Sequence, residues 1–308
     1  NVISNAIKFH RNDIVEYLDP DPYEALKYCI KYFNIECLVR FLNRIDFKRN
    51  LLIDDEFINV CFKCVCKNFS EIVKIVCYLY PDCVNQADFS HQYMIHHAIG
   101  NNFNEIAKFL CNFDRSDLNV TNGELETPLF IAVRQKNVEM VELLCNIEKV
   151  DLNAQNFQEN TAMQVALSLP SIEIVQIFIK HKNRINTMIH NNKQLTYMHF
   201  AITTKNLEIV KLINGLDDRL RLLGNKTNST PLIYAVSYGT PEIVEFLCSF
   251  DDVDVNLKNC HGISALHLAI ENPLILPILC HHSKIDLNIR NDQGNSPLHL
   301  AASKGKLE

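Results

Sequence analysis

The chain has 308 residues, 47% of them hydrophobic, and a formal net charge of −6 at pH 7. This mildly acidic balance argues against a nucleic-acid-binding protein, which usually carries a basic stripe. No run of 18 apolar residues occurs, so the sequence predicts no membrane-spanning helix. The polar N-terminal residues contain no hydrophobic stretch typical of a secretory signal.

Residues 1–55 are predicted to form two helix pairs. We expect the first pair at residues 2–10 and 13–18 and the second at residues 23–33 and 35–43. The prolines of Asp19-Pro20-Asp21-Pro22 break the chain between the pairs. Because a terminal repeat has one face without a neighbour, we expect residues 1–55 to be divergent capping repeats. A separate helical module with its own ligand is the alternative.

Residues 56–308 are predicted to be a stack of repeated units. The best-formed unit, Thr127 to Asn153, contains a short helix, a turn, a second helix and an extended exit. Its equivalents recur at a nearly constant spacing, with first positions at Thr127, Thr161, Thr196, Thr230, Ser264 and Ser296. Tyr93 and Asn59 extend the same period backwards. A fixed period of this length indicates stacked helical units that share one core.

The residue types within one unit predict where its helices begin. Thr or Ser at the first position can accept an orphan amide at a helix start, and a following Pro suits the first helical turn. The second helices are predicted to begin after four capping residues: Asn137, Ser171, Asn206 and Thr240. The chain has only 8 glycines, so we expect asparagines such as Asn191 and Asn225 to take turn positions. The segment 215–224 lacks the usual exit, which predicts a distorted hairpin after it.

The repeated motif resembles that of the ankyrin-repeat family. It reads Ser296-Pro297-Leu298-His299-Leu300-Ala301 and Ser264-Ala265-Leu266-His267-Leu268-Ala269, with degraded copies at Thr230 and Thr196. The resemblance implies an all-α solenoid of about ten stacked antiparallel helix pairs, joined by β-hairpin-like turns. It covers the whole chain and is weak within residues 1–55. Gly305-Lys306-Leu307-Glu308 matches the start of another second helix, so we expect the last repeat to be truncated, although Leu307-Glu308 also fits a cloning remnant.

Twelve cysteines invite a metal or disulfide interpretation. Cys77, Cys111 and Cys145 recur with the period of the repeat, as expected of small buried residues at equivalent positions. We therefore expect free thiols, a reducing compartment, and a cytoplasmic or nuclear location. The Cys61-x-x-Cys64 pair is expected to pack in a helix. The richest alternative metal-ligand set is Cys260, His261, His267, Cys280, His281 and His282, but the repeat already explains two of its members, and we expect no metal or cofactor.

No catalytic motif is present in the sequence, and the motif histidines are expected to form hydrogen bonds within or between hairpins. The resemblance implies a monomeric scaffold or adaptor that binds a protein partner, not nucleic acid. A regulatory segment of a larger enzyme or channel that continues beyond residue 308 is the alternative, and an enzyme in its own right is a third hypothesis.

In ankyrin proteins the contacts come from the concave face and the hairpin tips. By register, the first helices contribute Arg134, Gln135, Thr203, Thr204, Tyr238, Glu271 and Asn272. The tips contribute Glu124, Glu126, Phe157, Gln158, Lys193, Lys226 and His261. Phe157 is informative, because an aromatic side chain on a polar turn either binds a partner or folds back on its own hairpin.

Overall fold

The computed structural model describes residues 2–18, 55–169 and 171–305, together with positions 20, 25, 28, 29, 31, 32, 34, 36 and 37. Helices α1 (Val2–Lys8) and α2 (Asn12–Leu18) confirm the first predicted pair. The second predicted pair, at residues 23–33 and 35–43, lies mostly outside the described residues. The chain divides into two compact units, Asn1–Val150 and Asp151–Glu308, called here the N-terminal and C-terminal units.

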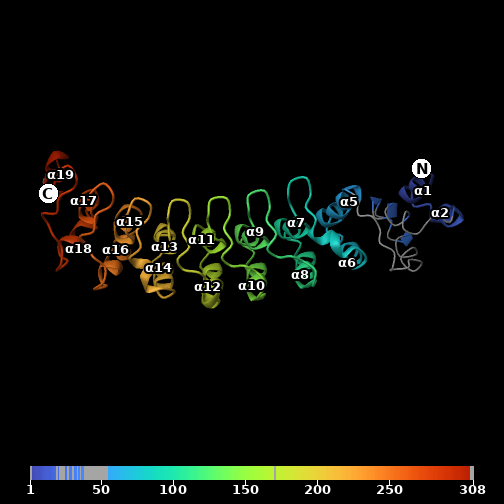
Figure 1. Ribbon diagram of the computed structural model, residues 1–308, viewed down its shortest axis with the longest axis horizontal. Coiled ribbons are helices and arrows are strands. Elements are labelled where there is room, and N and C mark those ends of the chain that lie inside the picture. Colours follow the sequence, from blue (N-terminus) through green and yellow to red (C-terminus); the bar gives the residue numbers. More distant parts are fainter. Residues whose placement is uncertain are drawn as a thin grey trace. The chain divides into compact units, whose positions relative to one another are not determined.

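Three further helix pairs follow among the described residues of the N-terminal unit. They are α5 (Asp55–Cys66) with α6 (Ser70–Leu79), α7 (Met94–Gly100) with α8 (Asn104–Asn112), and α9 (Pro128–Arg134) with α10 (Val138–Asn146). A 3-10 turn, η1 (Pro81–Asn85), follows α6. The first helices α5, α7 and α9 pack in one layer, and the second helices α6, α8 and α10 pack in another (Figure 1).

The C-terminal unit repeats the same two layers. Its first helices are α11 (Ala162–Leu167), α13 (Tyr197–Thr203), α15 (Pro231–Tyr238), α17 (Ala265–Ala269) and α19 (Pro297–Ser303). Its second helices are α12 (Ile172–Lys180), α14 (Leu207–Asn214), α16 (Pro241–Cys248) and α18 (Leu276–Cys280), with 3-10 turns η2 (Lys182–Arg184) and η3 (Asp218–Arg221). Within this unit the hairpin loops project from one edge of the first-helix layer (Figure 1).

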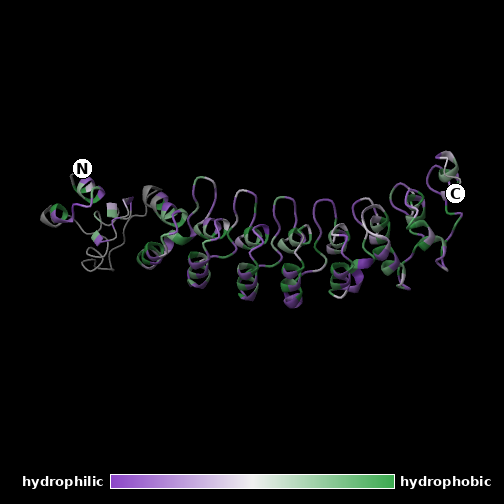
Figure 2. Cartoon of the chain, turned by 180° about the vertical axis from the view of Figure 1, so that it is seen from behind, coloured by the Kyte–Doolittle hydropathy of each residue, from purple (hydrophilic) through white to green (hydrophobic). Residues whose placement is uncertain are grey.

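Each helix buries an apolar stripe against its neighbours. Met140, Val141 and Leu144 of α10 are fully buried, for example, and the motif alanines Ala201 and Ala235 are fully buried between helices. Small residues at these two positions allow α13 and α15 to approach each other closely. Figure 2 shows the result as helices that change from hydrophobic on one side to hydrophilic on the other.

The predicted caps of the second helices are confirmed in position. Asn137, Ser171, Asn206 and Thr240 each precede their helix as N-cap residues. The side chains of Asn137 and Asn206 accept backbone amides, from Met140 N at 3.1 Å and Glu208 N at 2.9 Å respectively. This is the capping interaction that amide side chains favour at a helix start.

The hairpin tips are tight turns with a shared design. Asn156 shows it: its Oδ1 accepts the amides of Gln158 and Asn160 at 3.0 and 3.1 Å. The residue three positions after this asparagine, or after Asp88 in the tip before α7, has a positive φ in each described tip: His91, Leu125, Glu159, Gln194, Asn228, Gly262 and Gly294. The expectation that asparagines take turn positions is therefore confirmed at Asn191 and Asn225, whose side chains build the turn, while several residue types, Asn228 among them, occupy the left-handed position.

The expected distortion of the hairpin after residues 215–224 is wrong. Its tip has the usual bonds, with Asn225 N donating to Ser229 O at 3.1 Å. The missing exit is replaced by η3, which buries Leu220 completely. Asp217 fixes this turn by accepting Thr187 Oγ1 at 2.5 Å and the Arg219 guanidinium at 2.8 Å. The turn η3 thus accommodates the altered sequence, and the hairpin that follows keeps its usual hydrogen bonds.

Candidate functional site

The candidate site is the surface of each unit formed by the exposed side chains of the first helices and hairpin tips, called here the first-helix face. Its backbone is held by the motif histidines. His199 Nε2 donates to Ser229 O at 3.1 Å, and its Nδ1 lies 2.9 Å from Thr196 Oγ1. His267 makes the same contacts with Asn295 O and Ser264 Oγ, at 3.1 and 2.8 Å. These bonds join one helix start to the next hairpin and confirm the predicted structural role of both histidines.

Burial lowers the pKa of His199 to about 4, from its usual value near 6.5. The imidazole is therefore neutral at pH 7, as its bonding pattern requires, since Nδ1 accepts and Nε2 donates. Gln164 takes the place of this histidine in α11, where its Nε2 donates to Ile189 O and Leu195 O, each at 3.3 Å. A side chain at this position can thus join two repeats without acting as a base, and the buried Phe130 and Ile233 at the equivalent positions show that an apolar residue also fits there.

In the N-terminal unit the predicted contact residues divide into exposed and internal ones. Glu124, Arg134 and Gln135 are exposed. Glu126 is only 2% exposed, and its carboxylate lies 2.5 Å from the Arg134 guanidinium. The prediction that Glu126 contacts a partner is corrected on this ground, since its carboxylate is buried and serves the fold.

In the C-terminal unit the large predicted contact residues lie open to solvent. Phe157 is 78% exposed and Tyr238 is 53% exposed. The alternative in which Phe157 folds back on its own hairpin is therefore wrong. Four polar predicted residues at the tips are also exposed: Gln158, Lys193, Lys226 and His261.

The remaining predicted contact residues form hydrogen bonds within their own repeat or an ion pair with the next repeat. The hydroxyls of Thr203 and Thr204 donate to backbone oxygens one turn earlier, at 2.7 and 2.6 Å. Asn272 Oδ1 accepts the amides of Leu274 and Ile275, at 3.0 and 3.3 Å. Glu271 forms an ion pair with Lys304, directly after α19. Of these four residues, Thr203 and Glu271 are exposed and the other two are half-buried.

The first-helix face also contains aromatic residues that the repeat register does not predict. Phe200 on α13 and Tyr234 on α15 are half-buried at the position before the motif alanine. Tyr234 packs against Tyr238 with tilted rings whose centroids are 4.5 Å apart, and it makes an edge contact with His199 at 5.0 Å. In the N-terminal unit Phe89, on the tip before α7, is 83% exposed. The sequence marks Phe89 and Phe157 in the same way, because each directly follows the residue whose side chain builds the turn, Asp88 or Asn156.

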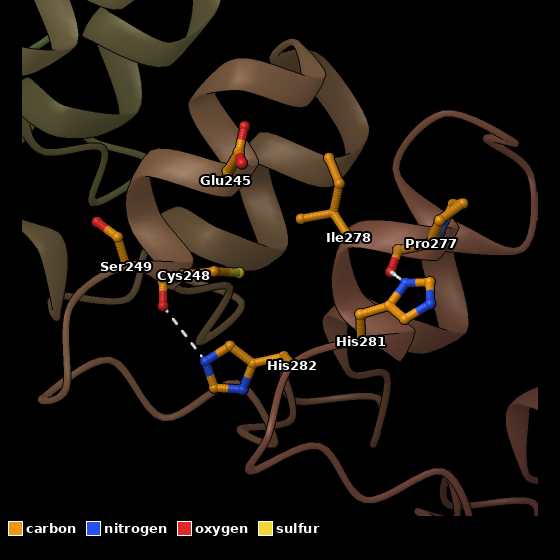
Figure 3. A pocket seen from close by; sticks show the side chains of 7 residues that line it. All are labelled: Glu245, Cys248, Ser249, Pro277, Ile278, His281 and His282. Carbon is orange, nitrogen blue, oxygen red and sulfur yellow. Dashed lines mark hydrogen bonds between the residues drawn. The ribbon is translucent and has the colours of Figure 1, made fainter.

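Two members of the Cys/His set, His281 and His282, line a pocket of about 430 Å³ between α16 and α18. Figure 3 shows that His281 and His282 face different backbone carbonyls. His281 Nδ1 lies 2.7 Å from Pro277 O, and His282 Nε2 lies 3.3 Å from Cys248 O. Within the described ranges no group of three or more His, Cys, Asp or Glu residues is arranged to hold a metal ion. Both imidazoles of the pocket are thus held by backbone carbonyls, and Glu245 and Ser249 line it beside the apolar Pro277 and Ile278.

All twelve cysteines lie among the described residues and none is in a disulfide. Burial raises the pKa of Cys64 and of Cys111 to about 12, so neither thiol ionises at neutral pH. Cys66, Cys260 and Cys280 are exposed. Among the described helices, none has the length and hydropathy needed to cross a membrane.

Comparisons with known proteins agree with this architecture. A family model described as ankyrin repeats in three copies matches residues 61–156, 147–220 and 213–291. The ankyrin repeat domain of Bcl-3, a member of the IkappaB protein family, is similar in structure, with a TM-score of 0.58 and 24% identity over 67% of this chain and 92% of that one.

Two other solved structures are also similar. The ankyrin repeat protein EF0377 gives a TM-score of 0.55 at 22% identity, over 61% of this chain and 97% of that one. A chain from the Bdellovibrio bacteriovorus predatory endopeptidase Bd0816 in complex with immunity protein Bd3460 gives 0.54 at 24% identity, over 63% of this chain and 98% of that one. A search of curated proteins finds no match. Since the three matches of the family model together span residues 61–291, the chain belongs to the ankyrin-repeat family.

Proposed function

We propose that this chain is a scaffold or adaptor that binds a protein partner through its first-helix face. Ankyrin repeats are in general protein-interaction modules, and the proposal assigns that role to the exposed residues of this chain. One observation carries it: large side chains that the repeat does not require lie open on this face, with Phe157 78% and Tyr238 53% exposed. Aromatic residues of this kind are enriched among those that dominate binding energy.

The bonding of the buried motif residues supports a binding function rather than a catalytic one. Motif residues that can act as acids or bases are engaged in the fold, as in the His199 bonds to Ser229 and Thr196. The exposed residues of the first-helix face differ from repeat to repeat, while the buried ones recur. A surface built this way can be specific for one partner without any change in the core.

The test begins with capture of partners by the immobilised chain from its source cell, followed by mass spectrometry. Affinity for the captured partner is then measured for the double variant Phe157→Ala/Tyr238→Ala. We expect at least a tenfold loss, because truncation of one central aromatic can cost ~2 kcal/mol or more. Tyr78→Ala is the matched control, since Tyr78 is 71% exposed but lies on the second helix α6.

Thermal melting should show that both variants remain folded, because surface substitutions usually change stability by less than ~0.5 kcal/mol. Full affinity in the folded double variant, or an equal loss in Tyr78→Ala, would place binding elsewhere and contradict the proposal. Failure to retain any protein partner would contradict it as well.

A further inference from the structure

Basic side chains gather on consecutive hairpins of the C-terminal unit. The basic edge, as we define it, consists of Lys193, Lys226, Lys258, His261 and Arg290, and all five residues are exposed. The hairpins that carry them are neighbours, because Lys226 N donates to Lys193 O at 3.2 Å and Cys260 N donates to Thr227 O at 2.8 Å. The next tip is equally close, since a Cβ on Gly262 would lie 2.5 Å from Asp292 N. These basic side chains therefore form one continuous row.

Acidic residues are nearly absent from this row. The tips 191–195, 225–229 and 259–263 contain none, and the tips on either side of them carry one each, Glu159 and Asp292. Tips of the N-terminal unit have the opposite composition, with Asp88, Glu124 and Glu126. The basic edge is thus a local departure from a chain whose net charge is −6.

The lysines of the first two tips are not used by the fold. No hydrogen bond or ion pair of the described residues involves the ammonium group of Lys193 or Lys226. Other cations of the same unit are paired with carboxylates, namely Arg221 with Asp252 at 2.6 Å and Lys284 with Asp251 at 2.9 Å. Exposed cations without partners have a positive potential that attracts anionic ligands and increases their rate of association.

Uncharged aromatic residues follow these lysines in the same repeats. The tip with Lys193 leads into α13, which presents Phe200, and the tip with Lys226 leads into α15, which presents Tyr234 and Tyr238. The hydroxyls of Thr203 and Thr204 lie at the end of α13 and bring no charge. A ligand along these repeats therefore meets cations at the tips and aromatic surface on the helices.

We propose that this part of the first-helix face binds an extended acidic segment of the partner protein, with carboxylates on the basic edge and apolar side chains against Phe200, Tyr234 and Tyr238. The inference rests on the proposed function and specifies the chemistry of its partner. A nucleic acid fits less well, because duplex DNA carries a phosphate charge about every 1.7 Å, whereas the tips with Lys193 and Lys226 each supply one lysine. The aromatic surface also matches a peptide with alternating charged and apolar residues.

A random-peptide display library selected on the immobilised chain tests this proposal. We expect enrichment of peptides that combine Asp or Glu with aromatic or aliphatic residues. The double variant Lys193→Glu/Lys226→Glu should lose this enrichment and bind the selected peptides at least tenfold more weakly. Lys193→Gln/Lys226→Gln, which removes charge without reversing it, should give a smaller loss.

Lys182→Glu/Lys205→Glu is the matched control. It makes the same change in net charge at two exposed lysines outside the hairpin tips, one in η2 and one between α13 and α14. We expect it to bind like the parent chain, and binding of acidic peptides by the parent should weaken as salt increases.

Three outcomes would overturn the inference: no acidic enrichment, equal losses in the tip and control variants, or tighter binding of a single-stranded oligonucleotide than of the selected peptides. If the captured partner still binds Lys193→Glu/Lys226→Glu with full affinity, the acidic-segment inference fails while the proposed function stands. If no protein partner is retained by the parent chain, the proposed function fails.

Discussion

At the scale of single residues, buried motif histidines make stability depend on pH. The pKa of His199 in the folded chain is lowered by burial to about 4, below the usual value near 6.5. The unfolded chain therefore takes up a proton first as pH falls, and the stabilising contribution, complete above about pH 6.5, is lost between there and pH 4. At pH 5 we expect a loss of roughly 2 kcal/mol from this residue.

The variant His199→Gln tests this linkage, because Gln164 shows that glutamine fits the same position. Urea unfolding at pH 7 and pH 5 should show a smaller decrease for the variant than for the parent chain. The exposed His261, replaced by glutamine, serves as the control and should leave the decrease unchanged. An identical pH dependence in His199→Gln would contradict the assignment.

Arg134 shows how a surface residue can belong to the fold. Its guanidinium contacts the buried Glu126 carboxylate at 2.5 Å, so Arg134→Ala removes an ionic partner from a group that is only 2% exposed. We expect the free energy of unfolding to fall by about 1–3 kcal/mol, a range that allows for the half-exposed guanidinium. Chemical denaturation would measure the loss. Gln135→Ala, one residue later, should change stability by less than ~0.5 kcal/mol, and a similarly small effect of Arg134→Ala would contradict the expectation.

The register of the repeat placed candidate residues on helices and tips but did not predict which of them the fold already uses. Glu124 and Glu126 are two positions apart on one tip, yet only Glu126 is buried. Its burial depends on neighbours that a sequence period does not specify. The same is true of Asn272, whose amide oxygen accepts two backbone amides.

At the scale of elements, the left-handed position of each hairpin tip is a site of local strain. Gln194 has φ +55° and Asn228 has φ +54°, yet asparagine tolerates this conformation better than glutamine. We expect Gln194→Gly to stabilise the chain by about 0.5–1 kcal/mol, a gain reduced by the flexibility of glycine when unfolded. Asn228→Gly should be nearly neutral in the same thermal-melting experiment. Destabilisation by Gln194→Gly would show that its side chain contributes more than its backbone conformation costs.

The sequence correctly predicted where the second helices begin. It did not predict the structure of the segment that follows α14. Caps such as Asn206 act through bonds to the next few residues, so a local pattern is sufficient to find them. The turn η3 depends instead on long-range contacts, namely burial of Leu220 and the bond from Thr187 to Asp217. Such contacts are not visible in the segment 215–224 alone, which explains why the hairpin at Asn225 was expected to be distorted.

At the scale of the whole molecule, the exposure of the thiols predicts their reactivity. Native protein treated with a thiol reagent should react rapidly at Cys66, Cys260 and Cys280, which are exposed, and slowly at the others. After denaturation all twelve cysteines should titrate. Replacement of the three exposed cysteines by serine should remove the rapid phase. Stoichiometric bound zinc, or several disulfides in protein purified without oxidation, would contradict the prediction.

The N-terminal residues are predicted to cap the repeat that begins at residue 56. In the described part of this region, Ile7, Val15 and Ala25 are buried, and Asn34 Nδ2 donates to Ile7 O at 3.2 Å and Asn12 Oδ1 at 2.8 Å. The described residues of this region thus include buried apolar side chains joined by polar contacts. Such a layer suits a cap, because a repeat stack needs an end that exposes little apolar surface.

Deletion of residues 1–55 tests the cap against a separate module. If these residues cap the stack, the deletion exposes apolar surface of the next pair, and patches of several hundred Å² promote association. We expect the 56–308 fragment to elute as oligomers in size-exclusion chromatography and to melt less cooperatively than the full chain. A deletion of residues 1–10 should give an intermediate effect, since Ile7 is then lost while Val15 and Ala25 remain. A monomeric 56–308 fragment with an unchanged melting temperature would instead identify residues 1–55 as an independent module, because removal of a separately folded module leaves the remaining core intact.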